Sequence, residues 1–311
     1  MEFLKNWTPY IYITRPKNLF LAGFTQFIIY HFLFENVQLN LELSGHLLYL
    51  FIFDTILIAA GGYIINDIFD YKTDKVNKPE KTYISKDISL KNAILYYSLI
   101  LSLGFVISIY IAIVTDNLPL LFLYPLACGL LYVYSKKLKN TVLTGNIVVS
   151  AFVSFVPGVI LIAERDMIFE RSIPDFQNLV IQLFIFYLVF SFIVNLIREI
   201  IKDIEDENGD RINGYNTLPI KYGIQVAKMW CIFLSLVTII SLVVWMSLTN
   251  IFVDFRLKVY LMLMVAAPLV IIIQILTKTT QKRDFSKIST IIKWTMLAGL
   301  GALILITKTN I

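Results

Sequence analysis

Two groups of acidic residues contain the side chains best suited to chemistry. The first is the segment "NDIFDYKTD", residues 66–74, which directly follows the apolar stretch "TILIAAGGYII". Asn66, Asp70 and Asp74 are spaced four residues apart, so on a helix they form one stripe, with Asp67 near its edge. The sequence therefore predicts a polar helix face at the point where an apolar helix ends.

The second group lies in the segment "REIIKDIEDENGDRINGYNTLP". Asp203, Asp206 and Asp210 follow one another at steps of three and four residues, which again predicts a stripe on one helix face. Asn195 and Glu199 extend that stripe backwards. Gly209 is a suitable residue to end this helix, and an end there would change the direction of Asp210.

Stacked carboxylates repel one another, so each stripe calls for a compensating cation. Carboxylate and amide oxygens, with no cluster of Cys or His, favour a hard ion such as Mg²⁺. Mg²⁺ is often held by a few carboxylates together with substrate phosphates, so two facing stripes would form a clamp for a diphosphate. The alternative is that both stripes are solvated helix ends that pair with lysines, but two stripes of similar spacing favour the metal site. The predicted metal ligands are Asn66, Asp70, Asp74, Asp203, Asp206 and Asp210.

The composition shows which elements must position these stripes. Hydrophobic residues make up 58% of the chain, charged residues 16%, and the mean hydropathy is +0.74. Asp, Glu, Lys and Arg are absent from five long runs, and about 20 apolar residues suffice for a membrane-spanning helix. These runs are 92–115, 140–163, 176–197, 229–249 and 259–276. Four more spans are expected at about 18–34, 47–69, 117–135 and 288–307. We therefore predict an all-α integral membrane protein, a nine-helix bundle that forms one domain over residues 1–311.

The distribution of basic residues predicts the orientation of the bundle. If the N-terminus is cytoplasmic, the inner segments hold 22 of the 27 Lys and Arg residues and the outer segments hold 5. This bias follows the positive-inside rule for multi-pass proteins of the cell membrane, and it places both acidic stripes on the cytoplasmic side. The net charge of +5 is then explained by topology, and no nucleic-acid partner is expected.

Three motifs in this order resemble the UbiA superfamily of intramembrane prenyltransferases. Residues 66–74 match its NDxxDxxxD motif, residues 203–210 match its second Asp-rich motif, and Tyr132 with Lys136 matches a YxxxK element. The segment "VNKPEKTYIS" is similar to the family's NKPxRPxxxGxIS, although Lys81 and Thr82 replace Arg-Pro and Lys86 replaces Gly. A lysine at position 81 keeps the charge but loses the two-pronged phosphate contact of arginine. The resemblance covers essentially the whole chain.

The resemblance implies Mg²⁺-dependent transfer of a prenyl group from a prenyl diphosphate to an acceptor in the membrane, with release of pyrophosphate. It implies that Asp70, Asp206 and Tyr132 are catalytic. Lys81, Lys136, Arg198 and Lys202 are expected to complement the charge of the diphosphate. The allylic cation that remains needs a dry pocket.

The acceptor is predicted less directly. The second acidic segment and "ITRPKNLFLAGFTQ" look most like family members that attach a geranylgeranyl group to geranylgeranylglyceryl phosphate. Under this hypothesis Arg15 holds the acceptor phosphate and Asn18 orients its hydroxyl. The alternatives are that Arg15 anchors the chain on the cytoplasmic side and that Asn18 caps a helix. An aromatic acceptor such as 4-hydroxybenzoate or dihydroxynaphthoate stays open.

A cation-coupled transporter is the alternative from another functional class. Transporters place their binding groups near the bilayer midplane, whereas only Asp54 lies deep within a predicted span, roughly 18 Å along the helix from Asn66. A carboxyl group at that depth should be protonated, paired or in contact with water. The clustering of the other acidic residues at one face favours the enzyme.

Overall fold

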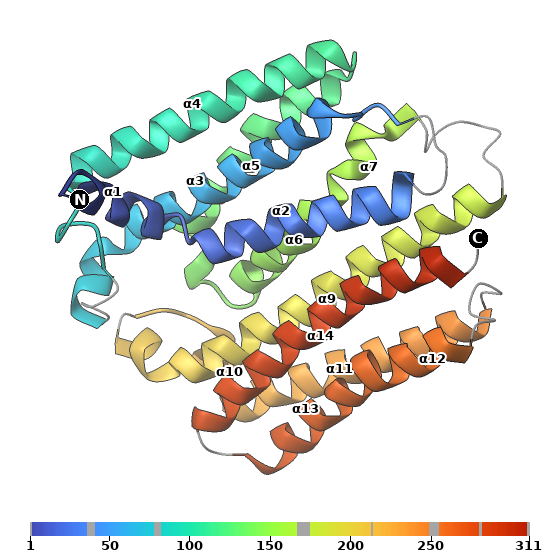
Figure 1. Cartoon of the computed structure of the whole chain (residues 1–311). Helices are drawn as coiled ribbons and strands as arrows, with labels where there is room; N and C mark the ends of the chain where they lie inside the picture. The colour runs from blue at the N-terminus through green and yellow to red at the C-terminus, as the bar shows by residue number, and fades with distance from the viewer. Residues whose placement is uncertain are drawn as a thin grey trace. The chain divides into compact units, whose positions relative to one another are not determined.

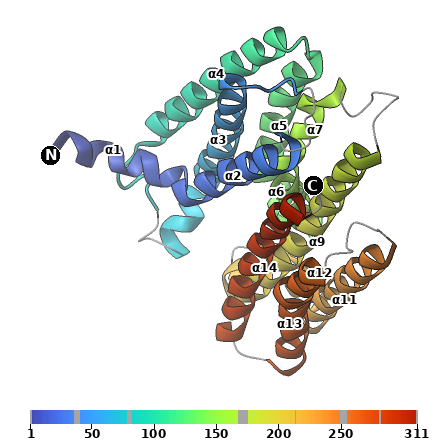
Figure 2. The ribbon, with the colours of Figure 1, turned by 45° about the vertical axis from the view of Figure 1, so that its right-hand side comes forward.

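A computed structural model describes residues 2–35, 41–77, 82–166, 175–212, 214–248, 255–279 and 282–309. Within these ranges the regular elements are helices, apart from an isolated bridge between Ile84 and Ile88, so the predicted all-α class is confirmed (Figures 1 and 2). The chain divides into two compact units. The first unit is 1–27, 40–139 and 159–170; the second unit is 28–39, 140–158 and 171–311.

Three long apolar helices form the body of the first unit and pack on one another, as Figure 1 shows. They are α3 (His46–Asn77), α4 (Leu90–Val114) and α5 (Leu118–Lys136). The unit also contains α1 (Glu2–Ile13), α2 (Pro16–Ile29) as far as Phe27, and the short α7 (Ile160–Ala163).

The helices α4 and α5 approach closely where a glycine faces a tyrosine. The Tyr124 hydroxyl donates a hydrogen bond to the carbonyl oxygen of Leu101 at 2.9 Å. A Cβ atom added at Gly104 would overlap that hydroxyl and lie 2.8 Å from two ring carbons. Gly104 therefore provides the space that lets the tyrosine reach the neighbouring backbone.

The second unit is built around α9 (Asp175–Ile212), which contacts α6, α11 and α14. Its helices are α6 (Thr144–Gly158), α10 (Leu218–Tyr222), α11 (Ile224–Leu248), α12 (Phe255–Leu261), the π-helix η6 (Met262–Ala266), α13 (Ala267–Lys278) and α14 (Lys282–Thr309). A further π-helical turn, η1 (Tyr30–Phe34), inserts the buried ring of Phe34 edge-on against the buried ring of Phe184 at 5.3 Å.

A buried lysine ties three helices of the second unit together. Lys228 on α11 donates a 2.8 Å hydrogen bond to the carbonyl oxygen of Thr279, at the C-terminal end of α13. The Thr279 hydroxyl lies 2.6 Å from Asp284 in the first turn of α14. Positive charge is favourable at a helix C-terminus and negative charge at an N-terminus, so this chain of contacts satisfies both helix ends.

The helices α3 and α9 are longer than a bilayer requires. About 20 helical residues cross a hydrocarbon core of roughly 30 Å, whereas α3 has 32 residues and α9 has 38. In each helix the acidic stripe lies in the part that follows the apolar span. The helix α9 passes through Gly209 without interruption to Ile212, so the suggested helix end at Gly209 is wrong, and Asp210 stays on the helical stripe.

Seven of the nine predicted spans are helices long and apolar enough to cross a membrane, counted over the described residues. The other two predicted spans are not among these seven. Residues 140–163 divide into α6 and α7 just after Pro157 and Gly158, whereas residues 18–34 cover most of α2 and the π-helical turn η1 that continues it. These seven helices indicate that the chain is an integral membrane protein. The count of nine spans stays a prediction.

Asp54 lies inside the span of α3 and is 8% exposed. Its Oδ1 atom is buried and has no hydrogen-bond partner within the part of the chain that the structure describes. The sequence left open whether this carboxyl group is protonated, paired or in contact with water. The structure shows that the group is buried and that its Oδ1 atom has no partner among the described residues.

A pair of glycine substitutions tests the packing of α4 on α5. We expect Gly104→Ala to lower the free energy of unfolding by about 1–3 kcal/mol, because the added Cβ overlaps Tyr124. The melting temperature should fall accordingly. Gly129→Ala on α5 is the matched control, since nothing lies within 4 Å of its Cβ position. This control should keep or raise the melting temperature, because alanine favours a helix interior. Equal melting temperatures for the two variants in detergent would contradict the packing.

Candidate functional site

The first acidic cluster, Asn66, Asp67, Asp70 and Asp74, lies on the last turns of α3 in the first unit. The Asn66 side-chain amide donates a 2.9 Å hydrogen bond to Asp70 Oδ2, which confirms that the two side chains share one helix face. All four residues are half-buried. These oxygens are therefore gathered at the polar end of an apolar helix, partly shielded from water.

Lys139 forms an ion pair with Asp70 through its Oδ1 atom. This lysine follows α5 in the short 3₁₀ turn Leu138–Asn140, and both side chains of the pair are at least 83% buried. Asp70 thus has an amide on one oxygen and an ammonium on the other. At the basic end of α5 the sequence analysis predicted Lys136 as a site residue and missed Lys139. The available signal was that Lys139 is the third lysine of "KKLK", directly after the apolar span.

Arg15 pairs with Asp67 at 2.8 Å and lies over the ring of Tyr63, 4.8 Å from its centroid. Its backbone has a φ of 55°, a left-handed conformation that is uncommon for a side chain of this size. The Arg15 carbonyl accepts the backbone N–H groups of Asn18 and Leu19, so Arg15 is the N-cap residue that directly precedes α2. The alternative that Asn18 caps this helix is wrong: Asn18 lies within the first turn of α2, and it is exposed.

Tyr132 and Lys136 lie one helical turn apart on α5. The Lys136 ammonium is 5.5 Å from the centre of the Tyr132 ring, and Phe69 of α3 meets the same ring edge-on at 5.4 Å. Because Phe69 directly precedes Asp70, this pair belongs to the same end of the first unit as the acidic cluster. Lys81 lies outside the described residues.

The second acidic cluster, Asn195, Glu199, Asp203, Asp206 and Asp210, lies on α9 in the second unit. Here α6 supplies polar partners. Asn146 donates a 2.8 Å hydrogen bond to Asp203 Oδ2, and Asn195 donates to the Ser150 hydroxyl at 3.3 Å. Sequence reasoning missed Asn146 and Ser150, although Asn146, Ser150 and Ser154 recur every four residues in an otherwise apolar run.

Arg198 and Lys202, predicted to contact pyrophosphate, both bind Glu199. The distances are 2.9 Å from Arg198 Nη1 and 2.9 Å from Lys202 Nζ to the same oxygen. Glu199 is largely buried, so a diphosphate that takes these cations would have to compensate for leaving this carboxylate unpaired. Asp206 is exposed, while Asp203 and Asp210 are half-buried.

The carboxylates do not form a ready-made metal cage. Within the described ranges no three Asp, Glu, His or Cys side chains converge on one point. Mg²⁺ is commonly bound through one or two carboxylates plus substrate phosphates and waters. A donor set of separate carboxylates and amides fits an ion of that kind, whose coordination a diphosphate would complete.

Comparison with known proteins adds a family to this geometry. Residues 37–297 match the UbiA prenyltransferase family. The chain belongs to this family. It is 33% identical over 268 residues to the digeranylgeranylglyceryl phosphate synthase of Saccharolobus solfataricus, and the match covers 86% of each chain.

Solved structures agree with this membership. A structure from a study of digeranylgeranylglyceryl phosphate synthase in membranes is 26% identical, with a TM-score of 0.68, and the match covers 98% of this chain and 100% of that one. A UbiA homologue from Archaeoglobus fulgidus, solved with GPP and Mg²⁺, shares the fold at 16% identity and a TM-score of 0.59, over 95% and 99% of the two chains. The resemblance read from the motifs is confirmed, and the chain is a membrane prenyltransferase. The roles of the individual residues stay predictions.

The contact between Asn146 and Asp203 can be tested by Asn146→Ala. This change removes a hydrogen bond to a carboxylate, so we expect kcat/KM for prenyl transfer to fall about tenfold. Ser154→Ala is the matched control, because Ser154 lies on the same helix and its hydroxyl donates to the nearby Ala151 carbonyl of that helix. Wild-type activity for both variants in a pyrophosphate-release assay would show that Asn146 does not orient Asp203.

Proposed function

We propose that the chain transfers a geranylgeranyl group from its diphosphate to the glycerol hydroxyl of geranylgeranylglyceryl phosphate, with Mg²⁺ and with release of pyrophosphate. An ether bond forms at the hydroxyl oxygen, and the carbon–oxygen bond to the diphosphate breaks. The observation that carries the proposal is the cluster around Asp70, where carboxylate oxygens meet an amide and an ammonium at the polar end of an apolar helix. The membrane-buried tail and the charged head of a prenyl diphosphate fit such a boundary.

The residues that would hold Mg²⁺ are Asn66, Asp70 and Asp74 on α3, and Asp203, Asp206 and Asp210 on α9. When bound, the metal would neutralise the diphosphate and make pyrophosphate a better leaving group. Asp70 and Asp206 are proposed as the central residue of each set. Loss of either should therefore impair turnover more than loss of a residue at the edge of its stripe.

The basic residues of each unit complement the charge that develops on the departing pyrophosphate. In the first unit these are Lys139, Lys136 and, outside the described residues, Lys81. In the second unit they are Arg198 and Lys202, which a diphosphate would draw away from Glu199. Bonds from these cations to carboxylate and to phosphate oxygens are both charge-assisted, but a diphosphate offers more oxygens and more negative charge than Glu199, which favours the exchange.

The face of Tyr132 is proposed to stabilise positive charge on the prenyl carbon. The ring already lies 5.5 Å from the Lys136 ammonium, so its face can accept a cation. The apolar helices keep water from the carbocation that would form. Tyr132 is 40% exposed, which leaves room for a ligand against it.

The acceptor assignment is supported by the names of the relatives and by Arg15. Several relatives at 30–34% identity are named digeranylgeranylglyceryl phosphate synthase. Arg15 carries half-exposed positive charge beside Asp67, where a phosphate could reach it, and Asn18 lies three residues further on. An aromatic acid could use the same charge, so an aromatic acceptor is the second candidate. The bias of basic residues supports a site that faces the cytoplasm in the cell membrane.

The direct test is pyrophosphate release by the purified chain in detergent with geranylgeranyl diphosphate and Mg²⁺. We expect release only when geranylgeranylglyceryl phosphate is added, and loss of release when EDTA removes the metal. Asp70→Ala should lower the rate at least about a hundredfold. Asp166→Ala, an exposed aspartate outside both clusters, is the matched control and should keep the rate.

The acceptor arms separate the two candidates. Stimulation by 4-hydroxybenzoate or dihydroxynaphthoate alone would keep the mechanism and overturn the glycerol-lipid acceptor. No release with any acceptor or prenyl chain length would contradict the proposed function.

The roles of Arg15 can be separated by a double-mutant cycle with Asp67. If Arg15 binds the acceptor phosphate, Arg15→Met should raise KM for the acceptor about tenfold, and KM for the prenyl diphosphate should stay unchanged. Asp67→Asn should leave KM for the acceptor close to that of the wild type. If instead Arg15 acts only by holding Asp67, the two single variants and the double variant will have the same kinetic defect.

A further inference from the structure

The second unit holds a lysine whose charge has no counterion among the described residues. Lys293 lies on α14, is exposed, and makes no ion pair or hydrogen bond with any residue that the structure describes. It lies inside the span Asp284–Leu305, where a charge is costly and is often functional. The other lysine of this span, Lys287, is neutralised by Asp284 at 2.9 Å. Lys293 therefore calls for an anion from outside the described chain.

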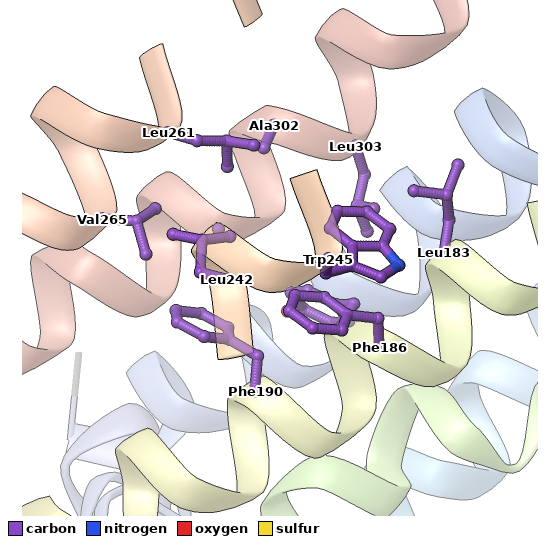
Figure 3. Close-up of a pocket in the computed structure, with 11 residues that line it drawn as sticks. Leu183, Phe186, Phe190, Leu242, Trp245, Leu261, Val265, Ala302 and Leu303 are labelled. Carbon is purple, nitrogen blue, oxygen red and sulfur yellow. The ribbon is translucent and has the colours of Figure 1, made fainter. Parts of the chain in front are cut away.

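The packing of α14 on α9 shows what surrounds this lysine. The two helices lie side by side and run in opposite directions, as Figure 1 shows. Figure 3 shows apolar side chains in this region, with Phe186 and Phe190 on α9 and Ala302 and Leu303 on α14. A Cβ atom added at Gly299 would lie 2.7 Å from the Phe190 ring, so these two residues are level along the helix pair. This contact sets the register of the two helices.

The register brings Lys293 close to Arg198 and Lys202 of α9. At 1.5 Å per residue, Lys293 lies about 9 Å from Gly299, and Arg198 and Lys202 lie about 12 and 18 Å from Phe190, all toward the end with the acidic stripe. Side chains on a helix lean toward its N-terminus, so in this antiparallel pair Lys293 and Lys202 lean toward each other. In agreement, the charges of Arg198 and Lys202 both act on Lys293. The three cations therefore form one cluster, the α9–α14 basic cluster.

The ion pairs of this cluster involve one carboxylate, that of Glu199. The Arg198 Nη1 atom and the Lys202 ammonium both lie 2.9 Å from the same oxygen of Glu199. The Arg198 Nε atom is buried and has no hydrogen-bond partner in the described ranges. One carboxylate thus serves two cations, while the Nε donor of Arg198 and the charge of Lys293 are left unused. This excess of positive charge suits a further anion.

We propose that Lys293 is a further diphosphate-binding residue, which acts together with Arg198 and Lys202. Guanidinium groups bind two phosphate oxygens at once, and an ammonium adds a point charge. Because the cluster contains a cation that Glu199 does not use, one of the α9 cations can stay on Glu199 when the ligand binds. This limits the cost of leaving a largely buried carboxylate unpaired.

This role of Lys293 rests on the proposed function. Asp203, one of the proposed metal ligands, directly follows Lys202 in the sequence. A diphosphate held by Mg²⁺ at Asp203 would therefore lie next to the basic cluster. The phosphate of the glycerol-lipid acceptor has similar chemistry, and the test below separates the two.

The test is calorimetric binding of inorganic pyrophosphate, with Mg²⁺, to the purified full chain in detergent. Lys293→Met keeps the length of the side chain but removes its charge, so we expect pyrophosphate to bind about tenfold more weakly, equivalent to about 1.4 kcal/mol. Lys293→Arg restores the charge and should restore most of the affinity. Lys287→Met on the same helix is the matched control and should bind like the wild type, because Asp284 already neutralises this lysine.

A readout within the wild-type chain covers the case in which Lys293→Met fails to fold. Pyrophosphate should protect Lys293 from acetylation by a water-soluble amine reagent, measured by mass spectrometry, and should leave the reactivity of Lys287 unchanged. Equal protection of both lysines or of neither, or wild-type affinity for pyrophosphate in Lys293→Met, would overturn the inference. A loss of affinity for glycerol 1-phosphate alone, titrated in parallel, would also overturn it and would assign Lys293 to the acceptor.

Failure of this inference can be told apart from failure of the proposed function, because pyrophosphate binding needs no turnover. If the wild type transfers the geranylgeranyl group and Lys293→Met keeps its affinity for pyrophosphate, only the role of Lys293 is wrong. If Lys293→Met loses that affinity but the wild type transfers no prenyl group to any acceptor, the diphosphate site stands and the proposed function is wrong.

Discussion

The constraint on which this molecule depends is the cost of holding several carboxylates where an apolar helix leaves the membrane. Like charges on one helix face repel, and partial burial weakens their solvation. In the first unit, Lys139, Arg15 and the Asn66 amide supply the compensating donors. These contacts are the kind that a metal ion and a diphosphate can exchange for their own, because each protein cation can turn from a carboxylate to a phosphate oxygen.

The second unit solves the same problem with different residues. Its acidic stripe is packed against a helix whose polar residues recur every four positions, and Asn146 anchors Asp203 without adding charge. Glu199 holds two cations on the same helix. The neutral Asn146 amide orients the half-buried Asp203 carboxylate, whereas the exposed Asp206 stays accessible to a ligand.

Much of this arrangement could be predicted from the sequence, because helical spacing determines which residues share a face. The stripes on α3 and α9 and seven of the apolar spans follow from period and composition alone. The partners from other helices could not be predicted. The contacts of Lys139 with Asp70, of Asn146 with Asp203 and of Arg15 with Asp67 depend on which helices pack together. The periodicity of a single helix carries no such information. The break at Pro157 and Gly158 and the continuation through Gly209 show the same limit, since packing around a residue decides whether a helix stops there.

The most direct test of the central claim is a calorimetric titration of Mg²⁺ into the purified chain, with and without a non-hydrolysable analogue of geranylgeranyl diphosphate. If the carboxylates hold the metal only together with the diphosphate, Mg²⁺ binding should be weak alone, strengthen with the analogue, and be lost in Asp70→Asn. Metal binding that is equally tight without the analogue, or unchanged in Asp70→Asn, would contradict the account.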